Sequence, residues 1–264
     1  MLLLILGILT LLIGGAGLGF GLLYDFASIP EESFLAKMGG FSSTTFLVIG
    51  IVFAVIGITM LIIGSTKKAK ITTMQLVESA LMIAAAVVLN ELLKIPAPWG
   101  GGLTVVSMLP LVLISHRYGA PWGLFTAYVF SLIELIFGLK NIGYAETTVM
   151  AVGIILLDYV IAYSVIGLSG IFGKERWSVA VGIAVTFSLR FLSHWVAGAW
   201  IWGVWMPETY WGMPMTNPWV YSALYNGWYM AAELALTELV AMLIYKPLEK
   251  YFRNVKTLKT EKAA

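Results

Sequence analysis

Long runs of apolar residues dominate the sequence, and short polar segments separate them. A run of roughly 18 or more apolar residues is long enough to cross a bilayer as a helix. Lipid cannot satisfy free backbone groups, so each spanning run is expected to be helical. The pattern predicts eight helices, the fourth being the shortest: 2–23, 44–65, 72–94, 103–116, 120–138, 147–171, 178–203 and 218–245.

The composition supports an all-α integral membrane protein. Of 264 residues, 60% are hydrophobic and 11% are charged, and the mean hydropathy is +0.91. Soluble domains carry about 25% charged residues. A net charge of +2 is too small to indicate nucleic-acid binding, and the lack of cysteine excludes disulfides and thiolate metal sites.

Basic residues are distributed unevenly between the two sides of the predicted helices. Because Lys and Arg are enriched in cytoplasmic loops, we expect a multi-pass protein of the cytoplasmic membrane with both termini cytoplasmic. The first run lacks a charged n-region and a small-residue cleavage site, so it is interpreted as a retained helix, with a cleaved signal peptide as the alternative. One side carries twelve basic residues, Lys67, Lys68, Lys70, Arg117, Lys174, Arg176, Lys246, Lys250, Arg253, Lys256, Lys259 and Lys262, and the other carries three, Lys37, Lys94 and Lys140.

The basic cluster at 67–70 also marks the best domain boundary. We expect a two-helix extension over 1–66, a six-helix module over 67–252 and a basic cytoplasmic tail over 253–264.

Glycines in the first helix favour close helix packing. Gly15 and Gly19, like Gly17 and Gly21, are spaced by four, as in small-xxx-small packing motifs. They do not fit the pattern of a phosphate-binding loop.

Charged residues inside spanning helices are candidates for function, because burying them in lipid costs about 2.5–3.5 kcal/mol each on insertion scales. No nucleotide-binding, metalloprotease or lipase motif accompanies them, so no catalytic site, metal or cofactor is expected. The only histidines, His116 and His194, are distant in sequence. The charges deepest in the predicted helices are Glu134, Asp158, Arg190, Glu233 and Glu238.

One helix combines polar and aromatic side chains on a single face. Arg190, His194, Gly198 and Trp202 are spaced by four and form a continuous stripe in a helix. The stripe indicates a ligand site; the alternative is a packed helix whose His194 bonds to a neighbour. Seven of the ten tryptophans lie between 195 and 228, and aromatic rings near a buried carboxylate favour an organic cation.

Two further segments carry open alternatives. The sequence from Lys94 to Gly102 contains two prolines and three glycines, which fits either a plain turn or a hinged lid with Trp99 as its plug. Ala80 and Ala84 form a small-xxx-small pair, suited to packing within the chain or to docking of another membrane subunit.

Three segments resemble the thiamine-specific substrate-binding (S) component of energy-coupling factor transporters, over about 71–252. They are Leu-Asp-Tyr-Val at 157–160, Arg-Phe-Leu-Ser-His-Trp-Val-Ala-Gly at 190–198, and Tyr-Ser-Ala-Leu-Tyr-Asn-Gly at 221–227. The resemblance implies a six-helix bundle that binds thiamine near the outer face. The partners it implies are a transmembrane coupling subunit and two ATPases. The resemblance omits the first two helices.

The resemblance also implies roles for individual residues. His194 and Trp202 would stack on the thiazolium ring, and Asp158, Tyr221 and Asn226 would contact the aminopyrimidine. Further implied roles are pocket shaping by Tyr159 and Gly198, a basic floor at Arg190, a gate over 95–102 that includes Trp99 and Gly101, and docking of the coupling subunit at Ala80 and Ala84. The sequence departs from the family at Asp158, typically glutamate, and at Thr148, where a pocket tyrosine is expected.

Two other functions fit the residues, whereas a purely structural membrane scaffold would leave the His194 stripe and Asp158 unexplained. One keeps the fold and replaces thiamine by a precursor or another vitamin. The other is an ion-coupled secondary transporter for an organic cation, with Glu134, Asp158 and Glu233 as a proton relay.

Overall fold

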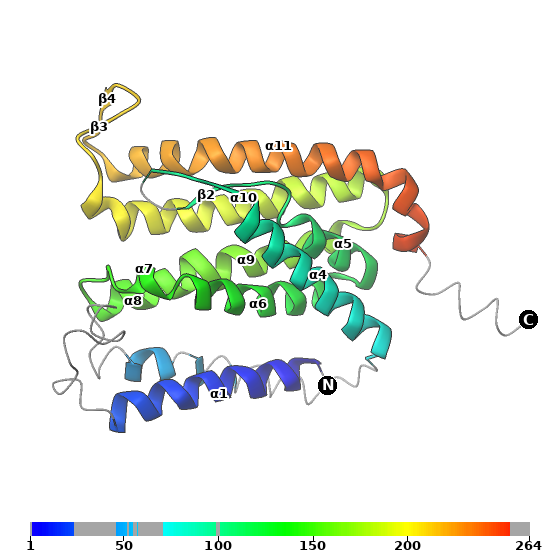
Figure 1. The fold of residues 1–264 in the computed structure, drawn as a ribbon, viewed down its shortest axis with the longest axis horizontal. Helices are drawn as coiled ribbons and strands as arrows, with labels where there is room; N and C mark the ends of the chain where they lie inside the picture. The colour runs from blue at the N-terminus through cyan, green and yellow to red at the C-terminus, as the bar shows by residue number, and fades with distance from the viewer. Residues whose placement is uncertain are drawn as a thin grey trace, which may run out of the picture. The chain divides into compact units, whose positions relative to one another are not determined.

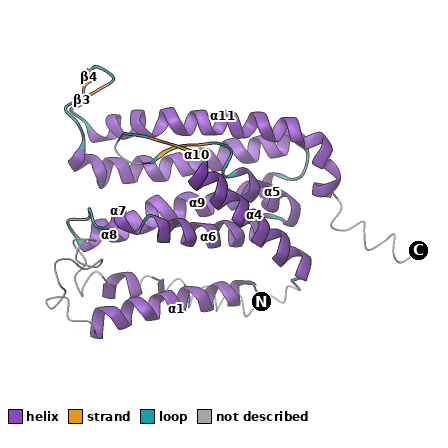
Figure 2. Ribbon diagram, viewed as in Figure 1, coloured by secondary structure: helices purple, strands orange, loops and turns teal. Residues whose placement is uncertain are grey.

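The computed structural model describes residues 2–23, 46–51, 53, 54, 57, 71–98 and 101–253, and most of these are helical (Figure 2). The chain divides into two compact units, Met1–Thr73 with Leu135–Leu156 and Met74–Glu134 with Leu157–Ala264. Within the described residues, five helical segments are long and apolar enough to cross a membrane: Thr73–Leu92, Ala120–Phe137, Thr148–Phe172, Arg176–Trp200 and Pro218–Phe252.

The second unit is built around α10 (Arg176–Trp200) and α11 (Pro218–Arg253), which run side by side (Figure 1). Proline begins α11, where its fixed φ suits the first turn of a helix. The unit also contains α4 (Thr73–Leu92), α5 (Leu109–Tyr118) and most of α6 (Ala120–Phe137). The left-handed Gly119, with φ of 92°, separates α5 from α6.

Polar contacts hold α4 to its neighbours. Of its residues only Ser79, Ala86 and Asn90 are buried. The Glu78 carboxylate pairs with Arg117 at 2.6 Å, and Asn90 Nδ2 donates to Glu134 at 2.6 Å. Because apolar burial is small, these charge-assisted contacts at both ends of α4 fix its place in the unit.

Four predicted helices are wrong in their details, the last of them because α11 continues to Arg253 rather than ending at residue 245. The helix expected over 103–116 begins only at Leu109, because 102–104 form a strand. The region 147–171 is helical but irregular, with α8 (Thr148–Gly153), a π-helix η2 (Ile154–Ile161), α9 (Ala162–Ser164) and a 3-10 helix η3 (Val165–Phe172). The helix expected to reach residue 203 ends at Trp200, and a 3-10 turn, η4, covers Trp202–Trp205.

Two short hairpins interrupt the all-α architecture. Strand β1 (Lys94–Pro96) pairs antiparallel with β2 (Gly102–Thr104), with Ile95 opposite Leu103. Strand β3 (Thr209–Tyr210) pairs with β4 (Met213–Pro214) in the loop that joins α10 to α11 and projects beyond their ends (Figure 1). The prolines and glycines that prevent helix in these segments allow tight turns instead.

The first unit contains α1 (Leu2–Leu23), α7 (Leu139–Ile142) and α8. A Cβ added at Gly14 would lie 2.8 Å from the Gly50 carbonyl oxygen, and one at Gly17 would lie 3.0 Å from Gly50 Cα. A Cβ at Gly15 or Gly19 would meet nothing within 4 Å. Among the described residues the predicted packing is therefore wrong for Gly15 and Gly19, but Gly17, from the second predicted pair, does make a close contact, as does the unpredicted Gly14. The surroundings of Gly21 lie outside the described residues.

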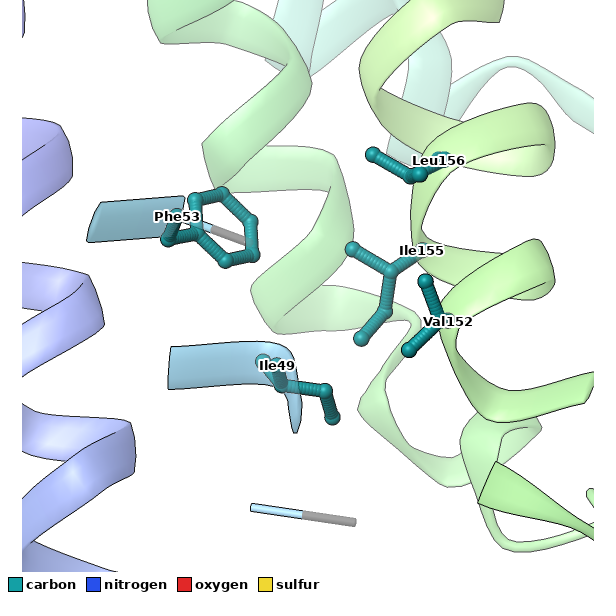
Figure 3. Close-up of a pocket in the computed structure, with 5 residues that line it drawn as sticks. All are labelled: Ile49, Phe53, Val152, Ile155 and Leu156. Atoms are coloured by element: carbon teal, nitrogen blue, oxygen red, sulfur yellow. The ribbon is translucent and has the colours of Figure 1, made fainter. Parts of the chain in front are cut away.

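An apolar hollow also lies in this unit, as Figure 3 shows. Its lining contains no polar side chain, so it offers no hydrogen bond to a ligand and is interpreted as packing. It is lined by Ile49, Phe53, Val152, Ile155 and Leu156.

Candidate binding site

A carboxylate, an imidazole and an indole meet in the second unit. Asp158 Oδ1 lies 3.0 Å from His194 Nδ1, and Asp158 Oδ2 accepts a hydrogen bond of 2.7 Å from Trp202 Nε1. Because an ionised carboxylate can only accept, Nδ1 of His194 carries the proton in this contact. Asp158 and His194 are each 15% exposed in their side chains, so the group is partly shielded from solvent.

Local backbone irregularity positions two of these three side chains. Asp158 lies within the π-helix η2, and Trp202 begins the 3-10 turn η4 rather than continuing α10. π-Helical segments in α-helices are frequent at functional sites. The predicted four-residue stripe is therefore correct for Arg190, His194 and Gly198 along α10, whereas Trp202 reaches the group from the following turn.

A second polar group lies on α11. Asn226 Nδ2 donates to the Ser222 carbonyl at 3.1 Å, and Asn226 Oδ1 accepts a hydrogen bond from the Tyr229 hydroxyl. A Cβ at Gly198 would lie 2.2 Å from Ser222 Oγ. Glycine at this position thus allows α10 to approach the polar group of α11.

An aromatic cluster surrounds this polar group. The Tyr221 ring lies 5.6 Å from the Tyr210 ring and 5.5 Å from the Tyr225 ring. Burial raises the pKa of the Tyr210 phenol above its ordinary value, so this ring is neutral at physiological pH. A cavity of about 440 Å³ opens beside the cluster and is lined by Pro96, Pro98, Thr209, Tyr210, Trp211 and Trp228.

Arg190 lies one turn before His194 on α10 and is paired. Its Nη1 lies 2.7 Å from Glu233 Oε2, and both side chains are almost fully buried. The guanidinium also lies 5.3 Å from the centre of the Tyr163 ring, which lies 6.5 Å from the ring of the buried Tyr159. Arg190 is thus a buried cation held by a carboxylate and an aromatic ring, and it supports the site structurally.

The described residues of the segment 94–102, which are 94–98 and 101–102, lie over the aromatic cluster. Ala97 is buried among its rings, and a Cβ at Gly101 would lie 3.1 Å from the Tyr229 hydroxyl. The candidate plug Trp99 lies outside the described residues. Ala80 and Ala84 are both exposed on α4.

The arrangement suits a small organic cation with hydrogen-bonding groups. Aromatic faces attract a cationic ring by about 0.5–2 kcal/mol each, and the Asp158 carboxylate supplies negative charge. Within the described residues no group of three metal-ligating side chains is present.

Comparison with known proteins decides the family. Residues 76–253 match the model of the thiamine transporter protein family (Thia_YuaJ). The chain belongs to this family. It is 30% identical over 198 residues to the thiamine transporter ThiT of Bacillus subtilis (strain 168), covering 69% of this chain and 96% of that protein.

Two further comparisons agree. The thiamine transporter ThiT of Lacticaseibacillus paracasei is 25% identical over 169 residues, 58% of this chain and 77% of that protein. The solved structure of ThiT from Listeria monocytogenes shares the fold, with a TM-score of 0.54 and 21% identity over 68% of this chain and 97% of that one. The family and the membrane-length helices identify a multi-pass membrane protein. The family is one of transporters, which is not a class of enzyme.

Several contacts that build the site were not predicted from the sequence. Tyr229 follows Asn226 by three positions and Ser222 precedes it by four, a helical spacing that could have linked them. Thr104 and Ser107, which bond to Glu233, gave no such signal because they lie far away in sequence.

Proposed function

We propose that this chain binds thiamine and serves as the substrate-binding component of an energy-coupling factor transporter. The observation that carries the proposal is the Asp158 carboxylate, which is hydrogen-bonded to both His194 and Trp202. This group occurs in a member of the thiamine transporter protein family. Thiamine joins a cationic thiazolium ring to an aminopyrimidine, which matches the charge and the aromatic rings of the site.

Recognition divides between the two ends of the ligand. We expect the His194 and Trp202 rings to face the thiazolium and Tyr221 and Asn226 to contact the aminopyrimidine. Each carboxylate oxygen of Asp158 has two lone pairs, so it can hold its ring partner and still accept from the ligand. We expect the pocket to be shaped by Tyr159 and Gly198 and to have Arg190 at its floor. The gate would be the segment 95–102, which includes Trp99 and Gly101.

The proposal includes the architecture around the site. Eight spanning helices, with α5 as the short one, would leave both termini in the cytoplasm of the cell, in agreement with the basic residues of the loops. The division into a 1–66 extension, a 67–252 module and a 253–264 tail is supported by a family match that begins at residue 76.

Transport would require partners. The exposed Ala80 and Ala84 provide a small-residue surface on α4 that permits close approach of a second membrane protein, here the coupling subunit. Two ATPase subunits would supply the energy, since the sequence has no nucleotide-binding motif of its own.

The structure favours this proposal over an ion-coupled transporter. A proton relay would use Glu134, Asp158 and Glu233 in succession, but each carboxylate is bonded within a different group: Asn90, His194 and Arg190, respectively.

Uptake of labelled thiamine into vesicles tests the mode of transport. We expect no accumulation with this chain alone under a proton or sodium gradient, and ATP-dependent accumulation when the coupling subunit and ATPases are added. Ion-driven accumulation by the chain alone would contradict the proposal. Competition by the isolated pyrimidine and thiazole halves distinguishes thiamine from a precursor.

A further inference from the structure

One buried carboxylate joins three elements of the second unit. Glu233 on α11 accepts a hydrogen bond of 2.6 Å from Thr104 Oγ1 and one of 3.3 Å from Ser107 Oγ, while its other oxygen pairs with Arg190 of α10. Glu233, Ser107 and Thr104 are 0%, 0% and 2% exposed, so these contacts are shielded from water. Hydrogen bonds to a charged group are stronger than neutral ones.

The two hydroxyls belong to the root of the β1–β2 hairpin. Thr104 is the last residue of β2, and Ser107 lies in the turn that leads to α5. Between them Val106 has a φ of 51°, a left-handed conformation that a β-branched residue adopts only under constraint. The Thr104 and Ser107 hydroxyls also lie 2.6 Å apart. Because both hydroxyls also bond to Glu233, one carboxylate holds the residues on both sides of the strained Val106.

The other end of this hairpin covers the aromatic cluster. Pro96 and Pro98 line one side of the cavity, and Gly101 lies against Tyr229, the residue that bonds to Asn226. Glu233 follows Asn226 by two helical turns on α11, and Arg190 precedes His194 by one turn on α10. A single ion pair thus connects the hairpin root with both helices that carry the site.

We propose that Glu233, held by Arg190, is a positioning residue that latches the β1–β2 hairpin over the aromatic cluster and its cavity, and thereby sets how fast the ligand leaves. The inference rests on the proposed binding of thiamine for its readout. Glu233 acts through Thr104 and Ser107 and does not touch the ligand itself. Loosening the root would let the hairpin open more often and would leave the Asp158, His194 and Trp202 group in place.

The test compares two variants in which valine, a residue of nearly the same shape, replaces a buried threonine and removes its hydroxyl. Thr104→Val removes the strongest contact from the hairpin to Glu233. Thr186→Val is the matched control, because Thr186 is also 0% exposed but its hydroxyl bonds only to backbone oxygens of α10, at Gly182 and Ile183. Stopped-flow tryptophan fluorescence with thiamine gives the association and dissociation rate constants of each purified variant, and thermal unfolding gives its stability.

We expect Thr104→Val to raise koff by about tenfold or more, as the loss of a hydrogen bond to a charged group predicts, with a much smaller change in kon. Thr104→Ser keeps the hydroxyl and should restore the wild-type koff, and Thr186→Val should leave koff unchanged. Equal koff values for Thr104→Val and Thr186→Val, or a Thr104→Val effect confined to thermal stability, would overturn the latch. Absence of thiamine binding by the wild-type chain would instead refute the proposed function.

Discussion

Replacing Asp158 by asparagine is expected to weaken thiamine binding by at least about tenfold, or about 1.4 kcal/mol. The carboxylate accepts from both His194 Nδ1 and Trp202 Nε1, and it is the negative charge nearest to these two rings among the described contacts. The substituted amide would keep one acceptor oxygen and place an N–H donor against one of the two ring N–H groups. The loss therefore combines a missing negative charge and hydrogen-bond acceptor for the ligand with misplaced ring partners.

The measurement is the equilibrium dissociation constant of thiamine for the purified variant in detergent. Asp158→Glu is the matched control, since it retains the charge at one methylene more and should lose less affinity than Asp158→Asn. An Asp158→Asn variant that is folded and binds thiamine as the wild type does would remove Asp158 from the site.

Arg190→Met is expected to destabilise the fold by about 3–5 kcal/mol. The guanidinium and the Glu233 carboxylate are 4% and 0% exposed, so the single replacement leaves an uncompensated buried charge. Thr104 and Ser107 remain as neutral donors to that carboxylate and offset only part of the loss. Thermal unfolding followed by intrinsic fluorescence should show a clearly lower Tm.

The double replacement Arg190→Met with Glu233→Met separates charge from packing. Because both charges are then absent, it should recover much of the stability that the single change loses. If the single and double variants unfold at the same temperature, the ion pair is not what stabilises this part of the bundle.

The sequence predicted the positions of the long helices well, for a simple physical reason. Hydrophobic length decides where a chain can cross lipid, so α4, α6 and α10 begin within two residues of the predicted starts. Hydropathy carries no information about backbone hydrogen-bond type. The hydropathy pattern therefore did not predict the two hairpins. It also did not predict the π-helix around Asp158, whose residues are as apolar as those of the helices next to it.

In the site, too, local features could be predicted from the sequence and long-range contacts could not. Spacing by four placed Arg190, His194 and Gly198 on one face of α10, because helix geometry is local. The pairing of His194 with Asp158, 36 positions earlier, and of Glu233 with Thr104, 129 positions earlier, depends on how distant segments pack. The resemblance named the first pair as neighbours in one pocket, but nothing in the sequence indicated the second.

Titration of the purified, detergent-solubilised chain with thiamine tests the central claim most directly. Trp202 donates to Asp158, so a ligand at this carboxylate should change intrinsic tryptophan fluorescence. We expect a saturable change at one thiamine per chain that is strongly weakened in His194→Ala. A flat titration with folded wild-type protein would contradict the proposed function, because thiamine would then not be the ligand of this site.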